Sequence, residues 1–244
     1  MSNIKYKSRG FSEYYSIHRH TWEDFYESER VILGRVIKGF KRPVTILDVG
    51  CGCGGLGEAL SNEFVLSYYK GIDINAHNIE YAKKHVARVI KCNNEFAMED
   101  VALFSETKKY DIVISLSCVD FNVEVEKMIR NCWEMVAEDG YFVLSVRLTN
   151  QKGVNDIKKS FQKISKDEND SEVANYVVFN YIELFRLLSS LEDANSIMSY
   201  GYWGKPSSTA STPYEKLCFS VIAVKKCNQS RSVLNMEMPI DLII

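Results

Sequence analysis

Residues 44–60, VTILDVGCGCGGLGEAL, are the stretch around which the chain is organised. Residues 44–49 form a short apolar run with β-branched members, which is typical of a buried strand. A cluster of glycines follows, and an apolar segment then predicts the start of a helix. Glycines let a backbone come close to a ligand, and the first N–H groups of a helix are free to face it. The stretch therefore predicts a strand, a ligand-binding turn and a helix.

Two acidic residues make this prediction more specific. Gly50, Gly52 and Gly55 fit the spacing G-x-G-x-x-G of dinucleotide-binding turns, which is a weak signal by itself. Asp48 stands two residues before the first glycine, and Asp73 ends the next strand-like run, YYKGIDI. A carboxylate in the second position can accept hydrogen bonds from both ribose hydroxyls of a cofactor that contains adenosine. A turn that merely links a strand to a helix would leave both acids unexplained.

The run DVGCGCG at residues 48–54 resembles the first motif of the class I S-adenosylmethionine (SAM) dependent methyltransferases. The resemblance covers roughly residues 40–150. It implies an α/β fold with a seven-stranded, Rossmann-like, doubly wound sheet, a C-terminal antiparallel hairpin, and SAM as the cofactor. The glycine turn would pass under the methionine part of SAM, and Asp73 would hold its ribose. The cofactor site that it implies comprises Asp48, Gly50, Cys51, Gly52, Gly54, Asp73, Ile74, Asp100, Val101 and Leu116.

Two of these residues are matched to the adenine ring. In the family, an acidic residue at the end of the third strand binds the adenine amino group, and the next residue packs on the ring. Asp100 and Val101 follow a predicted strand at residues 95–98 and fit these positions. Glu99 is an alternative for the acidic role. Asp100 could instead cap a helix-like segment that follows it.

The composition of the chain argues against several classes of protein. The 244 residues suit one α/β domain with additions, and a net charge of −2 provides no basic field for nucleic acid. Seven cysteines without regular spacing do not indicate a disulfide framework, and Cys51-x-Cys53 lacks a second Cys/His pair at metal-ligand spacing. No apolar run approaches a membrane span, and no apolar signal segment opens the chain. We expect a cytoplasmic protein without a metal and without a nucleic-acid or membrane partner.

The chain is predicted to have three parts. They are an N-terminal helical lid at residues 1–42, a SAM-binding methyltransferase domain at 43–227 with an insertion at about 149–178, and a C-terminal tail at 228–244. Residues 11–30 are unusually aromatic, and a helix from Trp22 to Gly39 is expected there. The aromatic side chains could close over the cofactor and the acceptor, or they could pack on the sheet as core.

Hydrophobic periodicity predicts the other elements. The helices are expected at about 55–62, 76–91, 122–137 and 180–191, with Gly140 ending the third. The strands are expected within 65–74 and at 110–116, 141–146, 196–203 and 216–225. The last two strands match the hairpin that the family resemblance implies.

The acceptor of the methyl group should lie beyond the carboxyl ends of the central strands, where open α/β sheets bind ligands. Methyl transfer requires an acceptor placed in line with the methyl group, and a hydroxyl acceptor gains from a general base. The candidates for a catalytic role are Asp120, His18 and His20. The candidates for binding the acceptor are Tyr15, Trp22, Arg147, Tyr202 and Trp203. Asp120 could instead cap the helix that follows, and Arg147 could pair with a surface acid.

The expected function is methyl transfer to a small polar metabolite, such as the hydroxyl or amine of a sugar or a nucleotide-linked sugar. The segment after the fourth strand, SCVDF, lacks the N-P-P-Y motif of family members that act on amide or base nitrogens. Two alternatives remain at this stage. One is an NAD-dependent oxidoreductase, and the other is a non-catalytic partner protein that binds SAM or a nucleotide.

Overall fold

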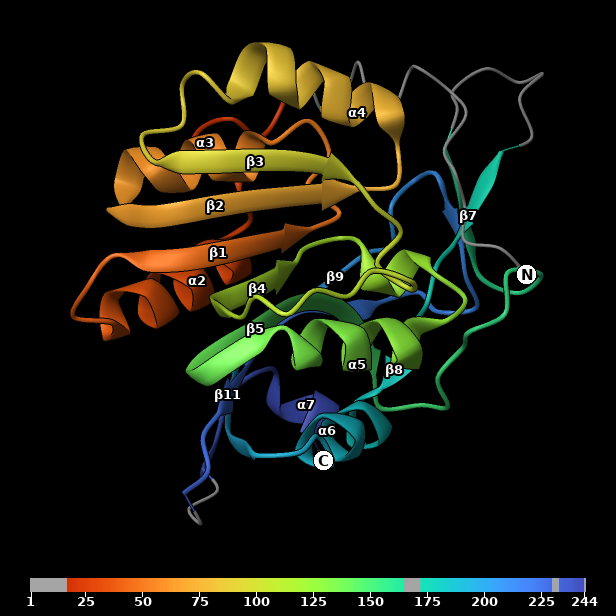
Figure 1. The fold of residues 1–244 in the computed structure, drawn as a ribbon. Coiled ribbons are helices and arrows are strands. Elements are labelled where there is room, and N and C mark those ends of the chain that lie inside the picture. The colour runs from red at the N-terminus through yellow and green to blue at the C-terminus, as the bar shows by residue number, and fades with distance from the viewer. Residues whose placement is uncertain (1–16, 165–171, 230–232, 244) are drawn as a thin grey trace.

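A single large β-sheet lies between two layers of helices (Figure 1). The computed structural model describes residues 17–164, 172–229 and 233–243. The strands of the sheet are β1 (Val44–Val49), β2 (Leu66–Asp73), β3 (Asn93–Met98), β4 (Tyr110–Ser115), β5 (Val136–Thr149), β8 (Phe179–Asn180), β9 (Ala194–Gly204), β11 (Leu217–Lys226) and β12 (Val233–Glu237).

The order of the strands confirms the predicted fold. Along the sheet they run β12-β9-β11-β5-β4-β1-β2-β3, and the short β8 pairs with β5. β1 is parallel to both β2 and β4, whereas β11 is antiparallel to both β5 and β9. The seven expected strands are therefore present, with the antiparallel hairpin at one side. β8 and β12 extend the sheet beyond seven strands, and β12 comes from the predicted tail.

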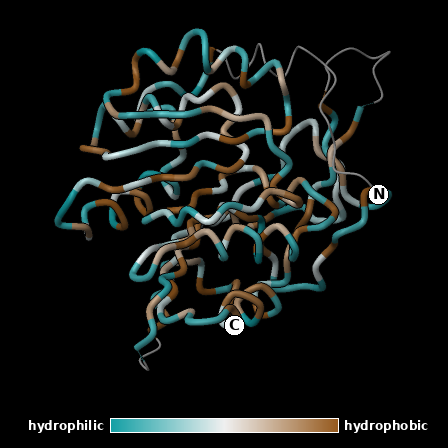
Figure 2. The backbone as a smooth tube through the Cα atoms, in the orientation of Figure 1, coloured by the Kyte–Doolittle hydropathy of each residue, from teal (hydrophilic) through white to brown (hydrophobic). Residues whose placement is uncertain are grey.

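The central strands are apolar on both faces because helices cover both sides of the sheet. All six residues of β4 are buried, and so are five of the six in β1. Figure 2 shows hydrophobic residues along the middle of the sheet and hydrophilic ones on the outer helices. One face is covered by α2 (Glu27–Gly39), α3 (Gly55–Glu63) and α4 (Ala76–Tyr81), and the other by α5 (Val125–Glu134) and α6 (Tyr181–Ser189).

The helix expected at residues 22–39 is divided in the structure. A 3₁₀ turn, η1 (Trp22–Asp24), is followed by an extended residue, Phe25, and α2 begins two residues later. Phe25 is buried, so its side chain enters the core instead of continuing the helix. α2 itself packs on the sheet through Ile32, Leu33, Val36 and Ile37.

A second, smaller sheet joins the predicted insertion to the loop between the last two strands. Its order is β10-β6-β7, and its strands are β6 (Phe161–Lys163), β7 (Val173–Asn175) and β10 (Ala210–Ser211). It has a small apolar core of its own around Tyr176, Val178 and Leu217. The small sheet is fastened to the loop after β4, because Val177 donates its backbone N–H to the Asp120 carbonyl.

Two predicted boundaries differ from the structure. The helix expected at 122–137 ends at Glu134, and Gly140 lies within β5 instead of ending that helix. A Cβ at Gly140 would stand 2.8 Å from the carbonyl oxygens of Ala137 and Asp111, so glycine permits close packing inside the sheet. The helix expected at 76–91 ends as α4 at Tyr81 and continues as a π-helical turn, η2 (Ala82–Val86). The remaining elements are η3 (Val119–Phe121) and α7 (Ile240–Ile243).

Within the described ranges, no helix is long and apolar enough to cross a membrane.

Candidate functional site

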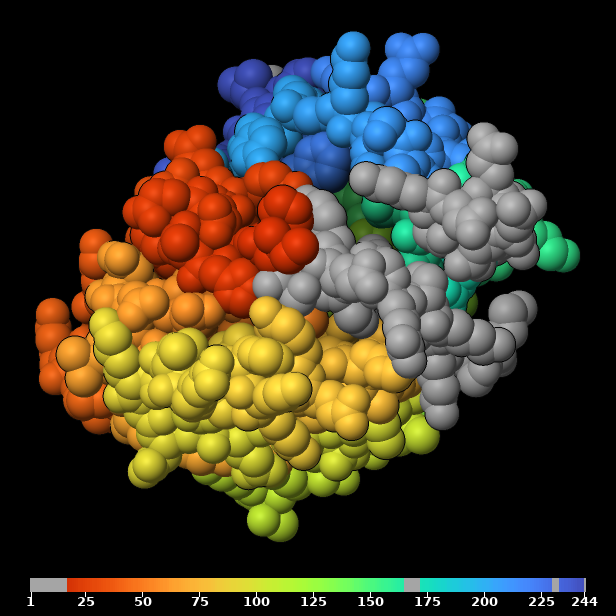
Figure 3. All heavy atoms as spheres, turned by 90° about the horizontal axis from the view of Figure 1, so that it is seen from above, coloured from red at the N-terminus to blue at the C-terminus, as the bar shows by residue number. Residues whose placement is uncertain are grey.

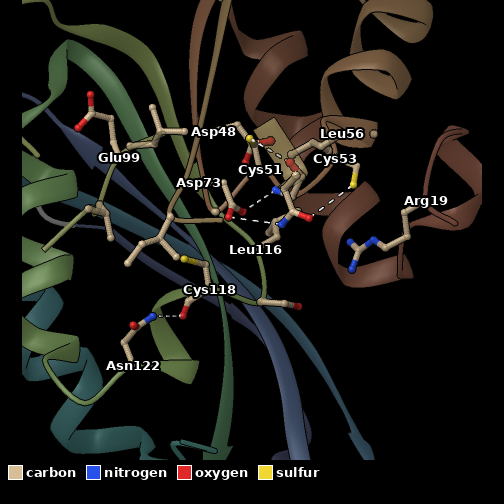
Figure 4. Close-up of a pocket in the computed structure, with 18 of the residues that line it drawn as sticks. Arg19, Asp48, Cys51, Cys53, Leu56, Asp73, Glu99, Leu116, Cys118 and Asn122 are labelled. Carbon is tan, nitrogen blue, oxygen red and sulfur yellow. Dashed lines mark hydrogen bonds between the residues drawn. The ribbon is translucent and has the colours of Figure 1, made fainter. Parts of the chain in front are cut away.

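A pocket lies at the carboxyl ends of β1, β2, β3 and β4 (Figure 4). This is where parallel sheets of this kind bind ligands, beside the point at which the strand order reverses. The predicted cofactor residues that line it are Asp48, Gly50, Cys51, Gly52, Asp73, Ile74, Asp100, Val101 and Leu116. Gly54 is the predicted cofactor residue that lies outside the lining.

The glycine turn has the backbone geometry that its sequence predicts. Gly50, Gly52 and Gly54 have φ angles of 76°, 54° and 88°, which favour glycine. A Cβ at Gly52 would have no protein atom within 4 Å, so this side of the turn faces open space. A Cβ at Gly54 would stand 2.9 Å from the Phe96 ring, so Gly54 serves the packing of the turn. Gly52 is thus the point where a ligand can approach the backbone most closely.

Asp73 connects the end of β2 to this turn. Its Oδ2 accepts a hydrogen bond from the Gly52 N–H at 2.9 Å, and its Oδ1 accepts one from the Asn75 N–H at 2.8 Å. Asn78 donates a longer bond of 3.4 Å to the same oxygen. Burial raises the pKa of Asp73, and the hydrogen bonds from Asn75 and Gly52 oppose that shift. The carboxylate is therefore fixed in the wall of the pocket.

Asp48 is the most deeply buried acid of the pocket lining, with 2% of its surface exposed. Its Oδ2 accepts a hydrogen bond of 2.5 Å from the hydroxyl of Tyr69 on β2. Burial raises the pKa of Asp48 to about 7, while the bond from Tyr69 lowers it. Burial thus favours the protonated form of Asp48, and the hydrogen bond from Tyr69 favours the charged form. The sequence did not identify Tyr69, because a tyrosine in a buried strand is expected to be a residue of the hydrophobic core.

The end of the pocket that was predicted to hold adenine contains both candidate acids. Glu99, Asp100 and Val101 all line the pocket. Asp100 also accepts a hydrogen bond from the Ala102 N–H at 3.0 Å, so it caps the turn that follows it. A cap and a ligand contact are compatible because a carboxylate has two oxygens, and Glu99 remains the alternative for the adenine.

The N-terminal segment at residues 18–25 forms a further wall. His18, Arg19 and Phe25 line the pocket, and the Arg19 guanidinium lies 2.6 Å from Glu29 on α2. A Cβ at Gly55 would stand 2.1 Å from the Arg19 carbonyl oxygen, so the segment packs directly on the start of α3. Figure 4 shows the Arg19 side chain across the cavity from Asp73 and Cys118. Figure 3 shows the described N-terminal residues, in red, between the blue and the orange-yellow parts of the chain.

Other predicted residues of the N-terminal region lie outside the pocket. The Nδ1 of His20 is 2.6 Å from Glu58 on α3, so this histidine fastens the segment to the helix. Trp22 packs edge-to-face on Phe64, with ring centroids 5.4 Å apart. Tyr15 lies outside the described residues.

Asp120 and Arg147, predicted on the acceptor side, are paired with each other. The two charges are 3.0 Å apart, and the exposed fractions of the residues are 3% and 5%. Arg147 also donates to the carbonyls of Asp120 and Val177, at 2.5 and 3.1 Å. Its guanidinium lies over the rings of Tyr176 and Phe121, 3.6 and 4.3 Å from their centroids. Neither charged residue lines the pocket, and the pair instead joins the loop after β4 to Tyr176 and Val177.

Burial raises the pKa of Asp120, and the charge of Arg147 opposes this shift. The second carboxylate oxygen, Oδ1, is buried and has no hydrogen-bond partner. The pair therefore has one unused acceptor.

The two predicted aromatic residues of β9 point in different directions, as alternate residues of a strand do. Tyr202 is near α2, since Ser28 and Tyr26 affect its pKa, which burial raises. Trp203 donates to Asp241 of α7 at 2.5 Å, and Lys216 lies over its ring. Only Tyr202 is therefore on the side of the sheet that carries the N-terminal segment.

The comparisons with known proteins agree with this geometry. Residues 47–142 match the family model of a methyltransferase domain. The fold is also that of a solved SAM-dependent methyltransferase from Clostridium acetobutylicum, with a TM-score of 0.58 and 13% identity over 87% of this chain and 98% of that one. Residues 47–142 therefore match a methyltransferase domain, and the fold around them is that of SAM-dependent methyltransferases.

Two curated relatives of this chain are named for methyl transfer in different reactions. The mitochondrial ubiquinone biosynthesis O-methyltransferase of Saccharomyces cerevisiae is 30% identical over 161 residues, or 61% of this chain and 52% of that protein. The malonyl-[acyl-carrier protein] O-methyltransferase of Bacillus anthracis is 29% identical over 126 residues, or 52% of this chain and 45% of that protein. The chain thus spans about half the length of these relatives.

The sequence did not identify several of the residues that line the pocket. Asn78 is in the first turns of the helix after Asp73, and this short spacing was the signal that could have found it. Ser117 and Asn122 lie in the loop after β4, where ligand contacts are expected. Arg19 had no distinguishing signal, because it reaches the pocket through the fold and not through a motif.

Proposed function

We propose that this chain is an enzyme that transfers a methyl group from SAM to a hydroxyl or an amine of a small molecule. The observation that carries the proposal is the open space at Gly52, in a turn whose backbone is held by Asp73. A nucleotide-like cofactor needs a close backbone approach at this point and a carboxylate at the end of the next strand. The family match supports SAM over NAD.

The residues of the pocket suit the parts of SAM. Asp73 would accept hydrogen bonds from the ribose hydroxyls, and Glu99 or Asp100 would bind the adenine amino group. Asp48 would face the positively charged end of the cofactor, where Arg19 could hold the methionine carboxylate. SAM supplies a methyl group already activated by its sulfonium. The chain must therefore position the acceptor and exclude water.

The acceptor is proposed to be a small polar molecule with a ring hydroxyl or amine, such as a sugar or a nucleotide-linked sugar. Ser117 and Asn122 bring polar groups to the pocket wall, and His18 is the histidine there that could take a proton. The two curated relatives are named O-methyltransferases, which favours oxygen as the acceptor atom. Asp120 and Arg147 would act indirectly, because they hold the loop that carries the lining residue Asn122.

Binding and turnover measurements test this function. Calorimetry should detect binding of SAM and of the demethylated product S-adenosylhomocysteine (SAH). It should detect no binding of NAD. Radiolabelled SAM should then transfer its methyl group to members of a panel of sugars, nucleotide sugars, phenols and acyl thioesters. Binding of NAD in place of SAM would support the oxidoreductase alternative. SAM binding without turnover on any acceptor would support a non-catalytic binding protein.

Asp73→Ala is expected to weaken SAM binding by about a hundredfold or more. The variant loses charge-assisted hydrogen bonds to the ribose, which are worth about 1.5–3 kcal/mol each. It also leaves the Gly52 N–H without its acceptor. Calorimetry on the folded variant measures the effect.

Asp111→Ala is the matched control for Asp73→Ala. Asp111 also accepts a backbone N–H, from Thr45 at 2.8 Å, and it pairs with Arg42, but it lies outside the pocket lining. This control should lose stability and keep its affinity for SAM. Unchanged SAM affinity in folded Asp73→Ala would remove Asp73 from the cofactor site.

A further inference from the structure

Tyr69 connects three parts of the cofactor pocket from behind. The residue is fully buried in β2, and its hydroxyl donates to Asp48 at 2.5 Å. Gly57 lies in the first turn of α3, against the ring of Tyr69. A Cβ at Gly57 would stand 2.6 Å from the Tyr69 ring, so the ring fits closely against the helix. Tyr69 therefore joins the start of α3, against which its ring packs, to Asp48, to which its hydroxyl donates.

We propose that Tyr69 is a positioning residue for the cofactor, because its hydroxyl holds the Asp48 carboxylate in its charged form toward the pocket. This inference rests on the proposed function, in which Asp48 faces the cationic end of SAM. Tyr69 itself does not line the pocket and acts through Asp48.

The surroundings of Asp48 show why such support is needed. Burial disfavours a charge, and the nearby carboxylate of Asp73 disfavours it further. Two groups act in the opposite direction, the Tyr69 hydroxyl from β2 and the Arg19 guanidinium from the N-terminal segment. From β4, the residue in register with Asp48 is the apolar Ile114. The balance leaves the pKa of Asp48 at about 7, so a small loss of support changes its charge at neutral pH.

The consequence is a cofactor affinity that depends on pH. A cationic ligand favours the ionised form of Asp48, so affinity should rise with pH through about 7 and then level off. Tyr69→Phe keeps the ring and removes the hydrogen bond that lowers the pKa. The midpoint should therefore move to higher pH. At pH 7 the variant should bind SAM several-fold more weakly, whereas at about pH 8.5 the two proteins should converge.

The test measures SAM and SAH binding by calorimetry between about pH 5.5 and 8.5. The wild type, Tyr69→Phe and Asp48→Asn are compared with the matched control Tyr110→Phe. Tyr110 is also buried, and its hydroxyl makes a bond of the same length, 2.5 Å, to Glu106, which is not in the pocket lining. We expect the control to keep the wild-type midpoint and Asp48→Asn to bind weakly with no dependence on pH in this range.

Thermal unfolding of the ligand-free proteins provides a readout that does not depend on SAM. The pKa of Asp48 is raised in the folded state, so its contribution to stability is complete below its ordinary pKa and is lost as the pH rises through about 7. Asp48→Asn should therefore gain melting temperature relative to the wild type at pH 8 and lose this advantage at low pH. In Tyr69→Phe, the contribution of Asp48 to stability should be lost at a higher pH than in the wild type.

The outcomes separate the two proposals. If Tyr69→Phe shows the wild-type midpoint in both measurements, Tyr69 is only a packing residue and the inference is wrong. If neither SAM nor SAH binds the wild type at any pH, the proposed function fails, and the inference fails with it. In that case the unfolding curves still report whether Tyr69 sets the charge of Asp48.

Discussion

Gly52→Ala is expected to lower the affinity for SAM by at least about tenfold while the protein stays folded. A Cβ at this position meets no protein atom within 4 Å, so the added methyl group would occupy the open space in which we propose that the cofactor binds. The φ angle of 54° adds strain of about 1–2 kcal/mol, because a residue other than glycine is disfavoured there. Calorimetry with SAM and chemical denaturation of the free protein separate the two effects.

Gly34→Ala is the control for this variant. A Cβ at Gly34 also meets no protein atom within 4 Å, but Gly34 lies within α2 and outside the pocket lining. Alanine favours a helix interior, so this variant should be slightly more stable and should bind SAM as the wild type does. If folded Gly52→Ala also binds SAM normally, the glycine turn is not the cofactor site.

Arg147→Met should cause the largest loss of stability, about 3–5 kcal/mol in the free energy of unfolding. The variant leaves the Asp120 carboxylate buried without its counter-charge, and Oδ1 of that carboxylate already has no partner. It also frees the carbonyls of Asp120 and Val177, which Arg147 now binds. Equilibrium denaturation measures the change.

Two further variants show whether the burial of the Asp120–Arg147 pair is the reason for the expected loss of stability. Arg35→Met breaks the exposed pair with Glu237, and it should have little effect because water replaces such contacts readily. The double variant Asp120→Leu/Arg147→Met removes both charges and should regain much of the stability lost by Arg147→Met. A double variant as unstable as the single one would show that the charge of Asp120 is not the cause.

Measurements of turnover distinguish a structural role of Asp120 and Arg147 from a catalytic role. Because Asp120 and Arg147 are outside the pocket lining and hold the loop that carries the lining residue Asn122, folded variants should be impaired mainly through displacement of that loop. The Michaelis constant for the acceptor should then rise more than the rate at saturation falls.

The sequence by itself determined the fold and identified most of the predicted cofactor residues that line the pocket. A run of apolar residues identifies a buried strand. A turn with positive φ angles requires glycine at those positions. Both features are therefore visible as local patterns in the sequence. Asp48 and Asp73 could be found because the ends of parallel strands meet at one edge of the sheet. These features depend on neighbours in the chain, and a sequence displays such neighbours directly.

Only the tertiary structure decided which side chains are partners. Asp120 and Arg147 are each at the end of a strand, and nothing in their local sequence says that they neutralise each other. From the sequence, Tyr69 is expected to be a core residue, and only the fold shows that its hydroxyl donates to Asp48. Arg19 lines the pocket only because its segment packs on α3. The physical reason is that periodicity reports the face on which a residue lies, whereas a contact also depends on how separate elements pack in three dimensions.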